Sequence, residues 1–91
     1  MTVAMDEAKF RAELEANGYT VLERTWEPGT VNDSHAHDFS ARLLCLEGSM
    51  EVTTSGTTQS CQPGDTIEVT AGVVHREVVG PEGVRLLVGR R

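Results

Sequence analysis

The chain has 91 residues, of which 38% are hydrophobic and 24% charged, the composition of one ordinary small domain. Fourteen acidic side chains against eight basic ones give a formal net charge of −6, which would repel a phosphate backbone or an anionic membrane surface. We therefore expect neither nucleic acid nor a membrane as a partner. No apolar run approaches the roughly 20 residues of a spanning helix, and residues 1–6 lack the pattern of a secretory signal, so the expected location is cytoplasmic.

The sequence predicts one helix, close to the start of the chain, where most residues from Asp6 onward are strong helix formers. Asp6 is a suitable N-cap, and Gly18 is suited to end the helix in the left-handed conformation. Phe10 and Leu14 share one narrow apolar face. We therefore expect this helix to pack against the outside of another layer.

From residue 19 onward the sequence consists of short β-branched and apolar runs between turn signals. Glycine and proline are expected to separate the strands, as at Gly48, Ser55-Gly56 and residues 80–83. Seven short strands are predicted, over residues 19–26, 41–46, 50–54, 57–61, 66–70, 73–79 and 84–88. So many short strands with frequent turns indicate an all-β antiparallel sandwich or barrel.

The chain has three histidines, His35, His37 and His75. Residues i and i+2 of an extended strand face the same side, so His35 and His37 are able to direct two imidazoles to one point. The imidazole of His75 joins them only if the sheet curls round to bring it there. Neutral imidazole is a common ligand of Zn, Cu, Fe and Ni, so this spacing favours a metal site built from two strands.

The residues around the histidine pair resemble the first motif of the cupin superfamily, G-x5-H-x-H-x3,4-E-x6-G. Gly29 is followed by five residues and then by His35 and His37, and Gly48 stands at the closing position. The segment before the third histidine is similar in the same way to a second motif.

That second motif is G-x5-P-x-G-x2-H-x3-N. Gly64, Gly72 and His75 occupy its glycine and histidine positions. Its proline is replaced by Thr70 and its asparagine by Val79. The resemblance to cupins extends over about residues 19–88, nearly everything except the helix.

The resemblance implies an all-β fold, the double-stranded β-helix or small jelly-roll barrel of cupins, over residues 19–91, with residues 1–18 as an N-terminal helical extension. It implies that His35, His37 and His75 hold a divalent transition metal, namely Fe, Mn, Ni, Cu or Zn. It also implies that the barrel binds a small-molecule ligand or substrate.

One position departs from the cupin pattern in a way that bears on the metal. Where the family usually carries a metal-binding glutamate, this chain has Ala41, or Arg42 if the longer spacing applies. Alanine there would leave a vacant coordination position and a small void. A site of three neutral histidines also lacks the negative charge of a carboxylate, and ligand charge tunes the Lewis acidity of a metal.

Two further residues are candidates for a catalytic role. Glu77 shares the strand parity of His75, so it is a candidate pocket acid or hydrogen-bonding partner of the ligands. Cys45 shares the parity of Ala41 and is predicted either to line the cavity or to be a buried packing thiol. Cys45 and Cys61 form no C-x-x-C pair, so two free thiols are expected in a reducing compartment.

The run from residue 41 to residue 46 is apolar on both faces of its strand. One face fills the barrel, and Leu44 and Leu46 on the other must be covered by another sheet edge, the helix or a second subunit. Small cupins commonly pair through a sheet, and a short chain gains core in that way, so a homodimer is expected.

Three functions are compatible with this sequence. The first is a small metal-dependent enzyme, a dioxygenase or an isomerase or lyase acting on a small carbonyl or acid compound. The second is a non-catalytic module that binds or senses a ligand. The third is a metal-free barrel whose histidines are vestigial. Whether the protein is an enzyme is left open by the sequence.

Overall fold

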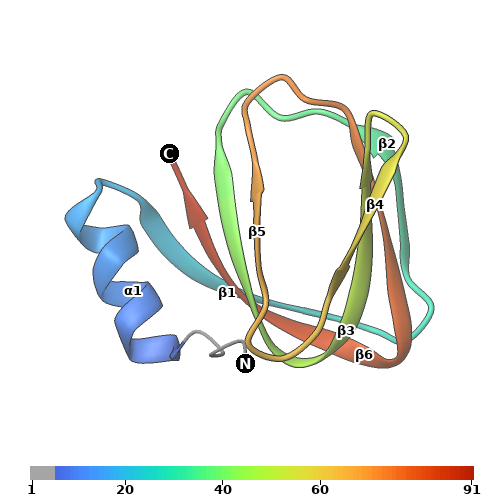
Figure 1. Cartoon of the computed structure of the whole chain (residues 1–91), viewed down its shortest axis with the longest axis horizontal. Helices are drawn as coiled ribbons and strands as arrows, with labels where there is room; N and C mark the ends of the chain where they lie inside the picture. The colour runs from blue at the N-terminus through green and yellow to red at the C-terminus, as the bar shows by residue number, and fades with distance from the viewer. Residues whose placement is uncertain (1–5) are drawn as a thin grey trace.

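The computed structural model describes residues 6–91, which form a barrel of strands with one helix on its outside (Figure 1). The elements in chain order are α1 Glu7–Ala16, β1 Thr20–Trp26, β2 Val31–His35, β3 Ala41–Thr54, β4 Thr57–Cys61, β5 Thr66–Val69 and β6 His75–Arg90. The all-β class with one short helix is confirmed, and so is the jelly-roll barrel. No helix within residues 6–91 is long and apolar enough to cross a membrane.

Two long strands, β3 and β6, organise the barrel. They pair with each other in antiparallel fashion from Ala41↔Arg90 to Thr54↔His75. The C-terminal part of β6 also pairs with β1, and its N-terminal part pairs with β2. The two parts of β3 pair in the same way with β5 and β4. Each long strand therefore belongs to both halves of the barrel.

The predicted strand breaks at Gly48 and at residues 80–83 are wrong, because both strands continue through them as bends. Between the pairs Gly48↔Val84 and Met50↔Val79, Ser49 alone opposes residues 80–83, so the ladder bulges sharply. Gly48 has a φ of +76°, and a Cβ at this position would lie 1.9 Å from the carbonyl oxygen of Gly83. The bend therefore requires glycine, and it lets each strand pass from one half of the barrel to the other.

β2 is not among the strands predicted from the sequence. Its residues, Val-Asn-Asp-Ser-His, are mostly polar, and three of the five are exposed. The other two, Asn32 and His35, are half-buried and line the cavity. Pairing of β2 with β6 compensates for the low β-propensity of this segment. This edge strand carries the first histidine.

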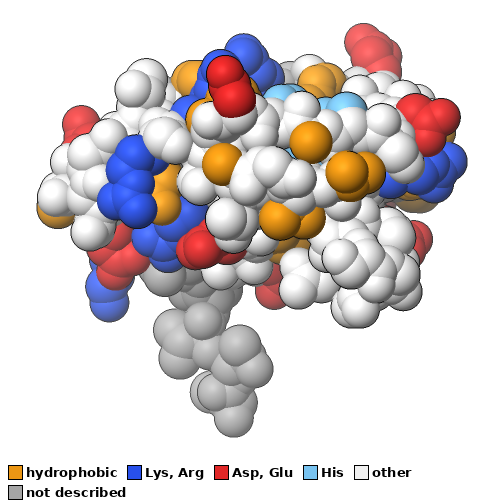
Figure 2. All heavy atoms as spheres, turned by 90° about the horizontal axis from the view of Figure 1, so that it is seen from above, with side chains coloured by type: hydrophobic (Ala, Val, Ile, Leu, Met, Phe, Trp, Pro, Cys, Tyr) orange, Lys and Arg blue, Asp and Glu red, His pale blue; other side chains and the backbone are white. Residues whose placement is uncertain are grey.

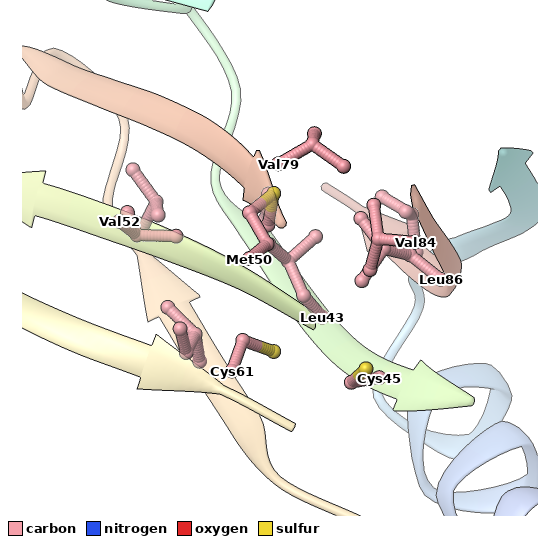
Figure 3. Close-up of a cluster of buried hydrophobic side chains, with 12 residues drawn as sticks. Leu43, Cys45, Met50, Val52, Cys61, Val79, Val84 and Leu86 are labelled. Carbon is pink, nitrogen blue, oxygen red and sulfur yellow. The ribbon is translucent and has the colours of Figure 1, made fainter. Parts of the chain in front are cut away.

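The interior of the barrel is partly filled by apolar side chains (Figure 3). The predicted parity of β3 is confirmed, because Ala41, Leu43 and Cys45 all face this core. Labelled in the figure are Leu43, Cys45, Met50, Val52, Cys61, Val79, Val84 and Leu86. The remainder of the interior is left open as a cavity.

Helix α1 covers the outer face of the β3–β6 ladder. Phe10 and Leu14 are fully buried and form a second apolar cluster with Leu44 and Leu87. Gly89 permits this packing, since a Cβ there would lie 2.5 Å from a methyl carbon of Leu14. The helix thus supplies the cover that the sequence required for this face, and the homodimer stays a prediction.

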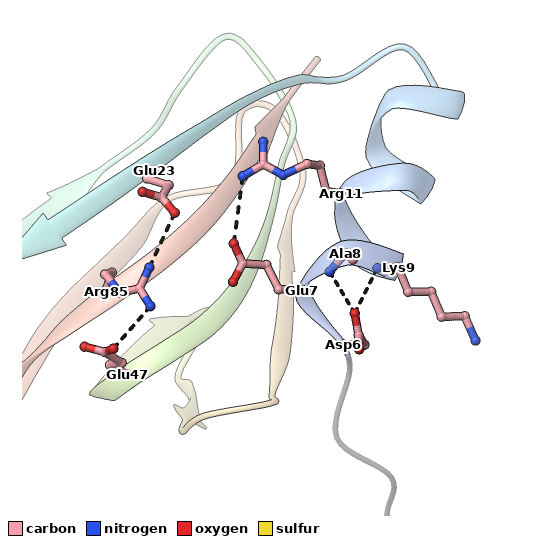
Figure 4. Close-up of polar contacts among 8 residues, drawn as sticks. All are labelled: Asp6, Glu7, Ala8, Lys9, Arg11, Glu23, Glu47 and Arg85. Carbon is pink, nitrogen blue, oxygen red and sulfur yellow. Dashed lines mark hydrogen bonds and ion pairs between the residues drawn. The ribbon is translucent and has the colours of Figure 1, made fainter.

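The ends of α1 are capped as the sequence predicts. The Asp6 carboxylate accepts hydrogen bonds from the backbone N–H groups of Ala8 at 2.8 Å and Lys9 at 3.2 Å (Figure 4). Gly18 follows the helix with a φ of +79°. The capped helix is therefore a fixed part of the described structure.

Replacing Phe10 by alanine is expected to lower the free energy of unfolding by about 3–5 kcal/mol, because it opens a cavity between helix and sheet. Lys9→Ala, next to it on the exposed side of the helix, should change this free energy by less than about 0.5 kcal/mol. Urea denaturation followed by circular dichroism measures both. Equal midpoints for the two variants would show that the helix is not part of the cooperative fold.

Candidate metal centre

The three histidines come together at one end of the barrel. His35 is the last residue of β2, and His75 is the first residue of β6; the two are paired across the ladder. His37 lies just beyond β2, in the connection to β3. This connection and the one that leads into β6 cross the same end of the barrel (Figure 1). The curl of the sheet that the sequence required is therefore present.

The two connections are hydrogen-bonded to each other. The backbone N–H of Gly72 donates to the carbonyl oxygen of His37 at 2.8 Å. The N–H of Ala71 donates to Oγ of Ser40 at 3.2 Å. These bonds fix the segment that carries His37 against the segment that precedes His75.

The distances within the histidine cluster are close to those of a metal site. One ligating nitrogen of each of His35, His37 and His75 lies within 4.8 Å of the other two. The ring centroids are 4.8 Å apart for His35–His37, 4.2 Å for His35–His75 and 5.2 Å for His37–His75. Two metal–nitrogen bonds of about 2.1 Å place their nitrogens roughly 3–4 Å apart.

Two of the imidazoles are held in the tautomer that a metal requires. Nδ1 of His35 lies within hydrogen-bonding distance of the carbonyl oxygen of Asp33, and Nδ1 of His75 lies 3.1 Å from that of Val73. A carbonyl only accepts, so each Nδ1 carries the proton and each Nε2 keeps its lone pair. The donor set therefore fits a divalent transition metal.

His37 is oriented by stacking. Its ring lies on Phe39 with centroids 4.6 Å apart and an interplanar angle of 15°. Burial lowers the pKa of His37, and the neighbouring His35 and His75 lower it further. The imidazole therefore stays neutral, and able to ligate a cation, at a lower pH than an ordinary histidine.

Glu77 lies beside the histidines, with only 5% of its surface exposed. Its Oε1 is 3.8 Å from Nε2 of His35 and accepts a hydrogen bond from Nδ2 of Asn32 at 3.3 Å. A buried carboxylate requires such partners because burial without them is costly. The structure thus places the candidate acid Glu77 within reach of a group bound at the histidines.

The histidines and Glu77 line a cavity of about 670 Å³. Its apolar wall includes Leu22, Trp26, Phe39, Leu43, Val69 and Val88. Figure 2 looks onto this end of the molecule and shows histidine side chains reaching the surface near hydrophobic ones. A cavity of this size suits a small molecule.

The shorter spacing of the first motif is the one that applies. Ala41 lines the cavity, whereas the Arg42 guanidinium lies outside the barrel, 5.2 Å from the centroid of the Phe10 ring. The position that lacks the family's glutamate therefore lines the same cavity as the histidines. Its methyl group leaves room where a carboxylate would have stood.

Cys45 does not line this cavity. It is 1% exposed, and its thiol donates to the carbonyl oxygens of Glu47 and Gly48, both at 3.6 Å. Burial raises the pKa of Cys45 and, together with the neighbouring Cys45, raises that of Cys61 to about 12. Cys45 and Cys61 are both free and buried, the packing-thiol alternative of the sequence.

Arg24 and Arg90 also line the cavity, and neither is among the site residues predicted from the sequence. Arg90 stands beside Arg91 near the end of the chain, yet it is half-buried and lines the cavity. A signal was present, because Arg90 shares the strand parity of Leu86 and Val88, and Arg24 shares that of Leu22.

The sequence model of the cupin domain family matches residues 22–88, which are most of the chain. The chain belongs to the cupin family. No curated protein matches this cupin. The family match covers the whole cavity-lining barrel except its last residues.

Solved structures agree with this assignment. An RmlC-like cupin from Shewanella frigidimarina has a TM-score of 0.70 and 25% identity, with 79% of this chain and 64% of that chain covered. KdgF from Halomonas sp. has a TM-score of 0.68 and 19% identity, with 79% and 67% covered. A structure of the DMSP lyases RdDddP and RnDddQII has a TM-score of 0.74 and 20% identity, with 80% and 38% covered. The cupin thus spans about two thirds of the first two and much less of the third.

The thiols give a direct test of the packing. Because burial raises the pKa of both, neither Cys45 nor Cys61 should react measurably with Ellman's reagent at pH 8 in the native protein. Both should react at once in 6 M guanidinium chloride. Fast labelling of the native protein would place at least one thiol at the cavity or the surface.

Proposed function

We propose that this cupin is a small metal-dependent enzyme acting on a small carbonyl or acid compound. His35, His37 and His75 would hold the ion, which is Fe, Mn, Ni, Cu or Zn. The observation that carries the proposal is the convergence of three imidazoles on one cavity, two of them fixed in the ligating tautomer by backbone carbonyls.

The ion and the side chains of the cavity would have different roles in the reaction. A divalent ion held by three neutral ligands would act as a Lewis acid toward a carbonyl or carboxylate oxygen. Glu77 is the carboxylate placed to accept a proton, since its Oε1 lies 3.8 Å from a ligating nitrogen of His35. The apolar wall at Trp26 and Phe39 excludes water from one side of the substrate.

This arrangement favours isomerisation or elimination over oxygenation. In such a reaction a C–H bond next to the substrate carbonyl breaks, its proton goes to the Glu77 carboxylate and its electrons move toward the carbonyl oxygen. The same proton then returns to another carbon, or a leaving group departs. One structure of similar fold is that of DMSP lyases.

The metal proposal is tested by elemental analysis of tag-free protein. The wild type should hold close to one divalent ion per chain. His75→Ala should lower metal affinity by more than the roughly 10–100-fold that loss of an outer-shell partner costs. Val74→Ala, at the exposed neighbouring position, should retain the ion. Absence of metal from the wild type at every loading would leave the metal-free barrel.

The proton-transfer role is tested by Glu77→Gln, which keeps the shape of the side chain. Turnover should fall by about 100-fold or more, while metal content stays unchanged. Glu51→Gln, an exposed position on β3, is the matched control. Substrates are screened as small oxo acids and hydroxy acids with the Fe, Mn, Ni, Cu and Zn forms. Turnover by none of these forms would assign the barrel to ligand binding.

The homodimer and the cytoplasmic location remain predictions from the sequence. Helix α1 already covers Leu44 and Leu87, so a dimer would have to form through another surface. Analytical ultracentrifugation at several protein concentrations distinguishes a monomer from a homodimer.

A further inference from the structure

We propose that the ligand of this cavity is a small organic acid whose carboxylate lies beside Ala41 and is held by the Arg90 guanidinium. The inference deepens the proposed function and rests on it, since the same carboxylate would face the three histidines. It names the substrate class and a specificity-determining residue, and it follows from the pairing and charge of the groups around the cavity.

The first observation concerns the arginines, of which the chain has seven. Five have polar partners on the protein, as Arg11 and Arg85 do in Figure 4: Arg11 with Glu7, Arg42 with Glu68, Arg76 with Asp33, Arg85 with Glu23 and Glu47, and Arg91 with the carbonyl of Asn17. Within residues 6–91, Arg24 and Arg90 form no ion pair with a carboxylate, and both line the cavity. Two arginines that form no ion pair in the described residues thus face the ligand space.

The second observation is the register of β3 against β6. Ala41 and Arg90 are directly opposite each other in the ladder, and both line the cavity. Opposite residues of an antiparallel pair that share a face have Cβ atoms about 5 Å apart. The short side chain of Ala41 therefore leaves space beside the base of Arg90, where a longer residue would fill it.

The third observation connects Arg90 with the histidine cluster. The Arg90 guanidinium lies 4.3 Å from the centroid of the Phe39 ring, and the same ring stacks with His37 at a centroid distance of 4.6 Å. The aromatic contact orients the guanidinium without using its N–H donors. Those donors remain available in the cavity that the three histidines also line.

The charges select an anion. Three neutral imidazoles with a divalent ion, Arg24 and Arg90 outweigh the two carboxylates that line the cavity, the buried Glu77 and the exposed Asp33, which is paired with Arg76. A planar carboxylate matches the fork of N–H donors on a guanidinium and also ligates a divalent ion, which a neutral ester or amide does less well. The apolar wall and a volume of about 670 Å³ fit a compact organic body on that carboxylate.

The experiment uses protein loaded with Co(II), whose visible spectrum reports a change of ligands at the ion. Metal content is measured first. Pyruvate, malonate and benzoate are then titrated, each beside its methyl ester as the neutral match. We expect at least one acid to change the spectrum at concentrations about tenfold or more below its ester.

Variants assign the effect to Arg90. Arg90→Gln should weaken binding of the acid by about 10–100-fold, and Arg90→Lys should recover part of it. Arg42→Gln is the matched control, because it removes the same charge one position along the ladder on the opposite face. Ala41→Glu should abolish binding of the acid while metal is retained, since its own carboxylate would take the vacant place.

The outcomes separate the two proposals. Wild-type protein that takes up no Co(II) would overturn the metal centre and this inference with it. Protein that holds Co(II) but binds acids no better than esters would overturn this inference alone. So would equal binding by the wild type and Arg90→Gln, or full binding of the acid by metal-loaded Ala41→Glu. If Arg42→Gln weakened binding of the acid as much as Arg90→Gln does, net charge, and not the Arg90 guanidinium, would determine binding. That result would also overturn this inference.

Discussion

The pairing of β3 with β6 is the constraint on which the rest of the structure depends. One end of this ladder joins Ala41 to Arg90, and the other end joins Thr54 to His75. The bend at Gly48 folds the ladder on itself, so that Ala41, Arg90 and His75 line a single cavity. A slip of one residue would turn each of these side chains to the opposite face of its strand. Site and fold are thus specified by the same hydrogen bonds.

The electrostatics of the barrel run against those of the whole chain. The formal net charge is −6, yet two arginines without carboxylate partners in the described structure face the cavity. Walls of low polarity strengthen a local field because they screen charge poorly. With a divalent ion bound, the cavity would therefore favour an anionic ligand, although the chain as a whole carries a net negative charge. Such a contrast disfavours large polyanions and still admits a small acid.

Much of this arrangement was predictable from the sequence, because side chains alternate between the two faces of a strand. The parity of Ala41, Leu43 and Cys45 on one face and Leu44 on the other is a property of any strand, and helix α1 was the apolar partner at hand for Leu44. The histidine cluster followed from spacing and from the resemblance to cupins. These predictions needed no knowledge of long-range pairing beyond the existence of a barrel.

Other features depend on pairing that no local pattern specifies. Residues 80–83 have the composition of a turn, and only the partner strand makes them a bulge within β6. β2 is polar and becomes a strand because β6 offers it an edge. Arg90 stands beside another arginine near the end of the chain, which is typical of a solvated position. Its orientation toward Phe39 is set by its register against Ala41.

The hydrogen bond between Gly72 and His37 has a consequence for how this barrel tolerates change. An insertion or deletion in either connection would displace both, and with them the rings at positions 37 and 75. Loops at the mouth of a barrel are usually the parts that vary most freely in length. Here the two connections are hydrogen-bonded to each other, so neither can change its length independently. A new ligand specificity would therefore have to arise from substitutions of the side chains that line the cavity.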